Sequence, residues 1–260
     1  MTAAELEAAV AEALEIARFA AAVMVQRADD VGARWTKASP TDWATDVDVA
    51  IEAEVRKRLA RRFPTHRCVG EEAGESGPPD GPTWYVDPVD GTSNYAAHLP
   101  WSAFSLGLVA DGVPQVGVIV DPFRGEVFHA RLGGGAFLGD RPIRVKGGPM
   151  AGRLVMTELS GRRRTTLALA QNLGSEQAIL RIMGSAALSL CQVAAGRAAG
   201  VVLHRSHPWD VAAGALLVNE AGAQLIDGSG QLSPLPASGL VAAAPDVARR
   251  LWELAFPAGG

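Results

Sequence analysis

A series of short apolar segments between residues 103 and 138 constrains the fold more than any other part of the sequence. It reads AFSLGLVADGVPQVGVIVDPFRGEVFHARLGGGAFL, in which Asp-Gly and Arg-Gly pairs separate segments rich in Val, Leu, Ile and Phe. Such dipeptides form the tight turns that join neighbouring antiparallel strands. We therefore predict an antiparallel meander here, with other layers of the fold covering its apolar surface.

Helical patterns lie on both sides of this meander. Thr2 and Glu5 form a capping box, and apolar residues at helical spacing follow as far as Met24. A second helical pattern begins at Thr45 and ends at Pro64. Its apolar stripe consists of Val47, Ile51, Val55 and Leu59. Further helices are predicted at residues 185–200, 210–223 and 246–255, and further strands at residues 66–72, 82–87, 153–157, 224–227 and 239–245.

The mixture of patterns predicts an α+β fold in which helices and sheets form alternating layers. Residues 34–46 contain Pro40 and polar capping residues, which predict a loop. The stretch from Lys146 to Gly152 is typical of a connection. We place a soft boundary there, between an N-terminal part (residues 1–148) with the acidic motifs and a C-terminal part (residues 149–260) that completes one compact unit.

Composition and charge argue against several kinds of function. The 260 residues carry a net charge of -4, so no polybasic face indicates nucleic-acid binding. The one basic run, GRRRTT, is predicted to be a solvated loop or the start of a helix. Cys68 and Cys191 lack metal-ligand spacing, which favours a reduced, cytoplasmic chain. No apolar stretch reaches membrane-spanning length and the first residues lack a signal-peptide pattern, so we expect no membrane association.

Acidic side chains concentrate where predicted strands end and predicted helices begin. Their positions are Glu71 and Glu72 after Gly70, Asp87 and Asp90 after the apolar run WYV, Asp42, Asp46 and Asp48 around the second helix start, and Asp210 at a later helix start. Carboxylates without Cys or His partners suit a hard cation, above all Mg²⁺. A divalent ion would also relieve the repulsion between neighbouring carboxylates.

The segment after the second of these aspartates has the residues of an anion site. If a short helix begins at Gly91, Thr92 and Ser93, its free N–H groups point at an anion, and a phosphate would lie between these groups and the metal. Metal ions that clamp phosphate oxygens are typical of phosphoester hydrolysis. The common alternative for an Asp-x-x-Asp motif is a capped turn with solvated acids. The position of Asp87 behind WYV favours a strand edge instead.

Three motifs in order resemble the signatures of the inositol monophosphatase family: GEE (70–72), DPVDGTSN (87–94) and WDVAAG (209–214). The resemblance extends from Lys37 to Asp227. It implies a layered αβαβα sandwich of the sugar phosphatase type, and a hydrolase that is a lithium-sensitive, Mg²⁺-dependent homodimer with two or three ions per site. Lys37 is open to two interpretations, a charge that screens the acidic site and an ordinary surface lysine.

The resemblance also implies roles for individual residues. The metal ligands would be Glu71, Asp87, the carbonyl of Val89, Asp90 and Asp210. The catalytic residues that orient and activate water would be Thr92, Asp48 and Glu71. Phosphate would bind to Gly91, Thr92 and Ser93. The substrate side would be lined by Asp90, Gly184, Ser185, Ala186 and Arg205, although a surface salt bridge is the commoner role for an arginine such as the last.

Two departures from the family pattern leave the substrate open. Inositol-selective members carry a glutamate seven residues before the WD aspartate, and this chain has Leu203 there. The segment after residues 155–161 is also shorter than the resemblance implies. We expect a phosphomonoesterase for small polyol or sugar phosphates, with inositol 1-phosphate as the family default. Histidinol phosphate and fructose 1,6-bisphosphate are alternatives, and a 3′-phosphoadenosine nucleotide is less favoured. The non-enzymatic alternatives are a sugar-phosphate sensor and a partner of the transcription machinery.

Overall fold

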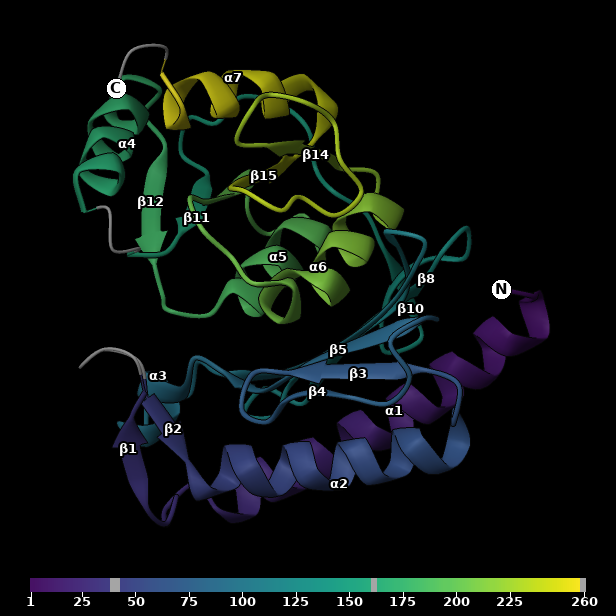
Figure 1. The fold of residues 1–260 in the computed structure, drawn as a ribbon. Helices are drawn as coiled ribbons and strands as arrows, with labels where there is room; N and C mark the ends of the chain where they lie inside the picture. Colours follow the sequence, from purple (N-terminus) through teal and green to yellow (C-terminus); the bar gives the residue numbers. More distant parts are fainter. Residues whose placement is uncertain (38–42, 160–162, 258–260) are drawn as a thin grey trace.

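The computed structural model describes residues 1–37, 43–159 and 163–257 and shows a stack of layers (Figure 1). Within these residues, two helices, an eight-stranded sheet, two helices, a five-stranded sheet and two helices follow one another from the bottom to the top of the view. This order confirms the predicted α+β fold with αβαβα layering.

The first layer contains α1 (Ala3–Gln26) and α2 (Asp46–Arg62). The predicted capping box between Thr2 and Glu5 is present at the start of α1. α2 begins directly after Thr45, whose hydroxyl group accepts a hydrogen bond from the N–H group of the second following residue. The predicted apolar stripe of α2 is buried against the sheet and α1: Val47, Ile51, Val55 and Leu59.

The eight-stranded sheet has the strand order β10-β9-β8-β7-β6-β5-β3-β4. Its central part confirms the predicted antiparallel meander, which consists of β6 (Ala103–Ala110), β7 (Val113–Asp121), β8 (Glu126–Arg131) and β9 (Gly135–Leu138). The two edges are short strands, β10 (Arg141–Ile143) and β4 (Gly74–Ser76).

Two strands of this sheet position the acidic motifs. β3 (Arg67–Gly70) and β5 (Thr83–Asp90) pair in parallel, as neighbours in the sheet. Because parallel neighbours end at the same edge of a sheet, Glu71 at the end of β3 lies beside the end of β5. A register shift between Asp87 and Asp90 interrupts the pairing of β5 with β6. Such an irregularity redirects side chains at the end of a strand.

The middle layer consists of α5 (Ala186–Ala194) and α6 (Pro208–Glu220), which lie between the two sheets (Figure 1). Every residue of α5 is buried, which explains why its sequence is apolar on all sides. α6 approaches β6 closely because Gly107 has no side chain. A Cβ atom at Gly107 would lie 2.7 Å from the backbone nitrogen of Ala213.

The last two layers are the five-stranded sheet, ordered β12-β11-β13-β15-β14, and the outer helices. The strands are β11 (Leu154–Thr157), β12 (Ile179–Ile182), β13 (Gly200–Leu203), β14 (Gln224–Asp227) and β15 (Leu240–Ala243). The outer helices are α4 (Arg163–Ser175) and α7 (Pro245–Ala255). The eight-stranded sheet consists of residues before the predicted connection at 146–152, and the five-stranded sheet consists of residues after it. The boundary between the two parts of the chain stays a prediction.

The sequence-based prediction of a loop at residues 34–46 was wrong for residues 34–36 and 43–45. β1 (Arg34–Thr36) and β2 (Trp43–Thr45) pair as antiparallel strands, and Pro40 and Asp42 lie outside the described residues. The patterns did not predict β12 or β13, and of α4 they indicated only a helix start, as one of two interpretations of the basic run. α5 also ends at Ala194, before the predicted residue 200, because the chain returns as β13. The backbone of α4 begins within the basic run, as its helix-start interpretation predicted.

No helix among the described residues is long and apolar enough to cross a membrane. Cys68 and Cys191 are free and buried.

Candidate active site

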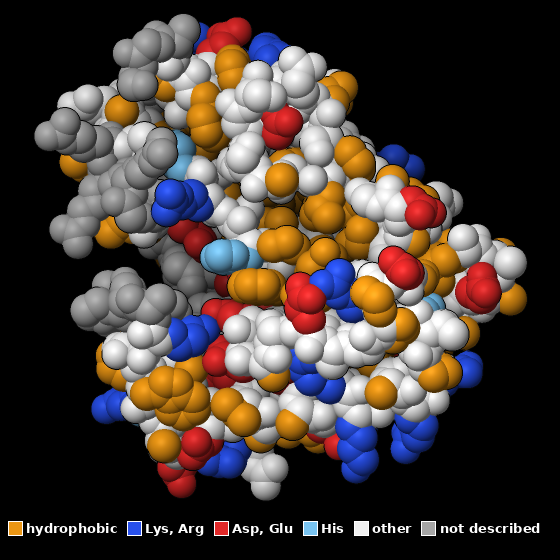
Figure 2. Space-filling view, viewed as in Figure 1, with side chains coloured by type: hydrophobic (Ala, Val, Ile, Leu, Met, Phe, Trp, Pro, Cys, Tyr) orange, Lys and Arg blue, Asp and Glu red, His pale blue; other side chains and the backbone are white. Residues whose placement is uncertain are grey.

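Acidic side chains gather in a notch between the lower and upper layers (Figure 2). A pocket of about 240 Å³ lies between elements of both halves of the chain. Its acidic lining comprises Glu71, Asp87, Asp90, Glu158 and Asp210. The rest of the lining comprises Trp43, Val89, Gly91, Thr92, Ser93, Gly184 and Ala186. The structure thus brings most of the predicted site residues together around one small cavity.

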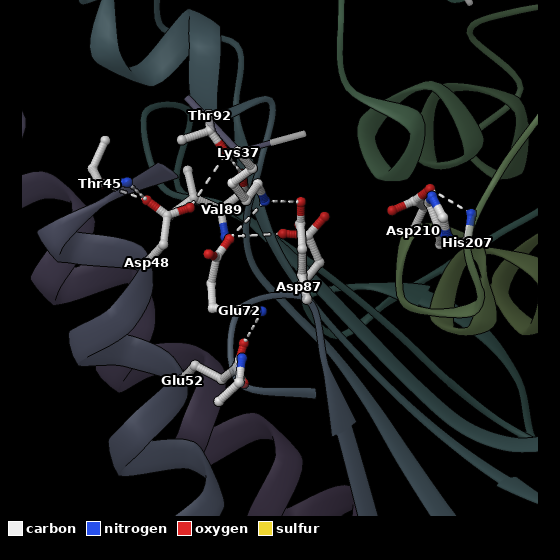
Figure 3. A network of polar contacts seen from close by, with 12 residues as sticks. Lys37, Thr45, Asp48, Glu52, Glu72, Asp87, Val89, Thr92, His207 and Asp210 are labelled. Atoms are coloured by element: carbon white, nitrogen blue, oxygen red, sulfur yellow. Dashed lines mark hydrogen bonds and ion pairs between the residues drawn. The ribbon is translucent and has the colours of Figure 1, made fainter. Parts of the chain in front are cut away.

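Asp87 lines the pocket near the end of β5 (Figure 3). Its side chain is 2% exposed, and its Oδ1 atom accepts a hydrogen bond of 3.1 Å from the N–H group of Val89. Burial raises the pKa of Asp87 well above its usual range, and the charges of Glu71 and Asp90 raise it further. A positive charge placed beside Asp87 would therefore stabilise its ionised form.

Asp90 connects the pocket to the start of α5. Its Oδ2 atom accepts hydrogen bonds from the hydroxyl group of Ser185 (2.5 Å) and the N–H group of Ala187 (2.7 Å), and its Oδ1 atom accepts one from Ala186 (3.3 Å). Burial raises the pKa of Asp90 to about 7, against the lowering effect of the Ser185 hydrogen bond. The carboxylate therefore caps a helix from the other half of the chain as well as lining the pocket.

Gly91 makes the turn from β5 into the short helix α3 (Thr92–Ala96), which confirms the predicted helix start. Its φ angle is 87°, and a Cβ atom there would lie 2.8 Å from the carbonyl oxygen of Gly184. Both facts require glycine at this position. The N–H groups of Thr92 and Ser93 begin α3 and have no partner within the helix, and both residues line the pocket.

Thr92 and Asp48 meet behind the pocket (Figure 3). The Thr92 hydroxyl group lies 2.8 Å from the carbonyl oxygen of Val89 and 3.2 Å from Oδ1 of Asp48. The other carboxylate oxygen of Asp48 accepts hydrogen bonds from the N–H and hydroxyl groups of Thr45, as the cap of α2. Burial raises the pKa of Asp48 to about 7, although the Thr45 hydrogen bond opposes it.

Lys37 reaches the acidic loop after β3. Its ammonium group pairs with Glu71 and, at 2.9 Å, with Glu72. Burial lowers the pKa of Lys37, but the hydrogen bonds and charges of the two glutamates outweigh burial and raise it above the ordinary value. Lys37 thus screens the acidic loop, the first of its two predicted interpretations.

Glu52 holds the same loop from below and was not singled out by the sequence patterns. Its side chain is 1% exposed and accepts hydrogen bonds from the N–H groups of Glu72 (2.8 Å) and Ala73 (2.9 Å). It also pairs with Arg56 in the next turn of α2. Its contacts connect α2 to the loop that carries Glu71.

Asp210 contributes to the pocket from the first turn of α6 (Figure 3). Its Oδ2 atom accepts a hydrogen bond of 2.7 Å from the N–H group of His207. Burial raises the pKa of Asp210 to about 7, the His207 hydrogen bond opposes this, and the charge of Glu71 adds to it. Electrostatic coupling thus extends across the pocket between the two halves of the chain.

The donor set fits a hard cation. The pocket offers carboxylate oxygens and the backbone of Val89, with no His or Cys among the lining residues given above. No three His, Cys, Asp or Glu side chains in the described parts of the chain are arranged to hold one ion between them as they stand. In this arrangement Glu71, Asp90 and Asp210 each accept a hydrogen bond from a protein donor.

Three predicted residues do not line this pocket. Asp48 lies behind it, and the hydroxyl group of Ser185 is bonded to Asp90. Arg205 lines a separate hollow beside His204 and Ser206. Glu158, by contrast, lines the pocket and was missed. The signal available in the sequence was its position directly after the predicted strand 153–157, comparable to that of the strand-end aspartates.

A layered αβαβα sandwich with a carboxylate-lined pocket at its strand ends defines a protein of the sugar phosphatase type. The inositol monophosphatase family matches residues 1–255 of the chain. The chain belongs to this family and is a phosphatase.

Relatives and solved structures agree with this assignment. The Nus factor SuhB of Pasteurella multocida is 36% identical over 238 residues, which cover 89% of this chain and 88% of that protein. Inositol monophosphatase 1 of Solanum lycopersicum is 40% identical over 200 residues, which cover 73% of each chain. The structure of an inositol monophosphatase from Anabaena superimposes with a TM-score of 0.83 and 34% identity, over 96% of both chains.

Proposed function

We propose that the protein hydrolyses small polyol or sugar phosphate esters with Mg²⁺, and that inositol 1-phosphate is among its substrates. The observation that carries the proposal is that Glu71, Asp87, Asp90 and Asp210 line one pocket together with Thr92. The names of several relatives support inositol phosphates as the first substrates to test.

In this proposal the metal ligands are Glu71, Asp87, the Val89 carbonyl, Asp90 and Asp210. Two or three Mg²⁺ ions bound there would supply a nucleophilic water at neutral pH and compensate the charge of the phosphate oxygens. The raised pKa values of Asp87, Asp90 and Asp210 support this assignment, because a site that destabilises its own negative charges gains most from a cation.

The residues of the chain would prepare the reaction around the phosphate. N–H groups of Gly91, Thr92 and Ser93 would hold the phosphate oxygens at the start of α3. The hydroxyl group of Thr92 would orient the attacking water, and Asp48 would accept a proton through it. A carboxyl group with a pKa of about 7 is suited to accept a proton near neutral pH. Glu71 would be a further acceptor.

The alcohol part of the ester would lie toward Gly184 and Ala186, on the side of the pocket formed by the C-terminal half. Leu203, which replaces the family glutamate, is 1% exposed and lies in the core between the sheets. It therefore offers no polar contact to a substrate hydroxyl group. This is why histidinol phosphate and fructose 1,6-bisphosphate stay in the set of substrates to test.

Phosphate release from these esters, with and without Mg²⁺, tests the proposal. We expect Mg²⁺-dependent turnover by the wild-type protein, inhibition by lithium, and a loss of at least about 100-fold in kcat in Asp90→Asn. An Asp90→Asn variant that turns over like the wild type would show that the metal assignment is wrong. Glu7→Gln, a change on the exposed side of α1, is the matched control.

Assembly and location form part of the same proposal. β12 is an open edge strand whose Ile179 and Ile182 are 39% and 47% exposed, which supports a homodimer that covers apolar surface. For a homodimer, light scattering after size-exclusion chromatography should give twice the chain mass of 27.1 kDa. The two free, buried cysteines support a reducing, cytoplasmic location.

A second role, as a partner of the transcription machinery, is supported by relatives that carry the name Nus factor SuhB. It would be compatible with catalysis. Binding of the purified protein to RNA polymerase, compared between the wild type and Asp90→Asn, separates the two roles, because a binding role predicts equal binding by both proteins.

A further inference from the structure

Glu158 is the acidic residue of the pocket with no assigned role. It follows β11 directly and lines the cavity on the side of the C-terminal half. Its Oε1 atom is buried and has no hydrogen-bond partner among the described residues. A buried polar atom without a partner is unfavourable, so a carboxyl group of this kind in the lining of a cavity points to a ligand that supplies a hydrogen bond.

The chemistry of Glu158 suits an alcohol hydroxyl group. Its carboxyl group lines the same pocket as Asp90 and Asp210 but lies on the side of the C-terminal half. A carboxyl oxygen accepts a hydrogen bond from an alcohol hydroxyl group.

The position of Glu158 places it on the wall where the alcohol part of the ester would lie. β11 pairs with β13 in parallel, with Thr157 opposite Val202. Glu158 and Leu203 therefore occupy equivalent positions, each one residue beyond the paired residues. Leu203 is buried in the core. The two strands therefore end side by side, and Glu158 is the one of these two residues that lines the pocket with a polar group.

We propose that Glu158 binds a hydroxyl group of the alcohol portion of the substrate and so selects polyol phosphates over esters without hydroxyl groups. The inference rests on the proposed phosphatase function. Other buried polar atoms without partners among the described residues, such as Trp101 Nε1 and Ser102 Oγ, do not line this pocket.

The test compares two esters in two variants. Inositol 1-phosphate offers hydroxyl groups and phenyl phosphate offers none. In Glu158→Leu we expect KM for inositol 1-phosphate to rise about tenfold with little change in kcat, the result of losing one hydrogen bond made in the bound state. The kinetic constants for phenyl phosphate should change less than about threefold. Glu158→Gln keeps a donor and an acceptor and should retain most of the wild-type preference.

Controls separate the possible failures. Glu7→Leu, at an exposed glutamate of α1, should leave both esters unaffected. The thermal midpoint of Glu158→Leu without Mg²⁺ should equal or exceed that of the wild type, because an unpartnered buried oxygen is removed. Equal losses on both esters, or an unchanged preference, would overturn the role of Glu158. If the wild-type protein hydrolyses neither ester, the proposed function fails and the role of Glu158 fails with it.

Discussion

The hydroxyl group of Ser185 donates a hydrogen bond of 2.5 Å to Oδ2 of Asp90, across 95 positions of the sequence. This contact joins the end of β5 to the start of α5, and the same hydroxyl group caps α5 by accepting the N–H group of Leu188 (3.2 Å). The resemblance to the family implied that Ser185 faces the substrate. Its hydrogen bonds show a residue that holds Asp90 in place.

We expect Ser185→Ala to weaken both contacts. Loss of the cap should lower the free energy of unfolding by about 1 kcal/mol. Because the Ser185 hydrogen bond lowers the pKa of Asp90, its loss should raise that pKa and weaken Mg²⁺ binding most at pH values below 7. Calorimetric titration of Mg²⁺ at several pH values checks this. Ser189→Ala is the control, since Ser189 bonds to the Ser185 carbonyl without touching Asp90. Equal Mg²⁺ affinity in the two variants would contradict the positioning role.

The stability of the metal-free protein should fall as pH rises from about 4 to 7. The pKa values of Asp90 and Asp210 are about 7 in the folded chain, against an ordinary value of 3.8. Between these values the folded state binds more protons than the unfolded state, so the free energy of unfolding decreases with pH. The stabilisation that comes from protonation of these two carboxyl groups is complete below pH 3.8 and is lost as the pH rises through 7.

Urea unfolding in the presence of a chelator measures this slope. One pKa unit corresponds to about 1.4 kcal/mol. Even if only part of the pKa shift is present, the free energy of unfolding should decrease by at least about 1 kcal/mol over this pH range. Added Mg²⁺ should stabilise the protein more at pH 8 than at pH 5, because cation binding requires ionised carboxylates. A stability that rises across this range without Mg²⁺ would contradict the electrostatics of the pocket.

Glu52 should be required for the loop that carries Glu71. In Glu52→Gln an amide faces two N–H donors, and the pairing with Arg56 is lost. We expect a loss of about 1–3 kcal/mol in the free energy of unfolding together with weaker Mg²⁺ binding. Glu54→Gln on the same helix breaks only partly exposed pairs and should cost less than about 1 kcal/mol. If the two variants are equally stable, Glu52 does not support the loop.

Leu203→Glu should destabilise the protein more than it changes its substrate preference. Leu203 is 1% exposed, and a carboxylate at a buried position without a partner is expensive. The urea concentration at the midpoint of unfolding should fall clearly in Leu203→Glu. Leu203→Met, which conserves volume, should lower the free energy of unfolding by less than about 1.5 kcal/mol. A stable Leu203→Glu variant with a gain for inositol 1-phosphate would show that this position opens to the substrate.

Short-range signals made much of the fold predictable. The Thr2–Glu5 box, the apolar stripe of α2 and the turns of the β6–β9 meander depend on neighbours in sequence, and all are present. β12 was missed because it is an edge strand with mostly exposed residues and no alternation. In β1 and β2, Pro40 and polar residues between the strands masked the pairing of Thr36 with Trp43.

The site residues could be predicted where a motif lies at the end of a strand. They were harder to predict where contacts between distant parts of the sequence determine the position of a side chain. Glu71 follows β3, and Asp87 and Asp90 lie at the end of β5 after its apolar part, so their meeting at one edge of the sheet agrees with the pattern. The bond between Ser185 and Asp90 depends on how α5 packs, and the support of the acidic loop by Glu52 depends on where α2 passes beneath it. Glu158 carries no motif of its own, and its unpartnered oxygen is visible only in three dimensions.

The most direct test of the metal site is the anomalous diffraction of crystals grown with Mn²⁺ in place of Mg²⁺. We expect peaks in the pocket within ordinary ligand distance of Asp87 and Asp90, with Asp210 coordinating one of the same ions. Peaks confined to other parts of the surface, or an Asp210 carboxylate that contacts none of the bound ions, would contradict this expectation.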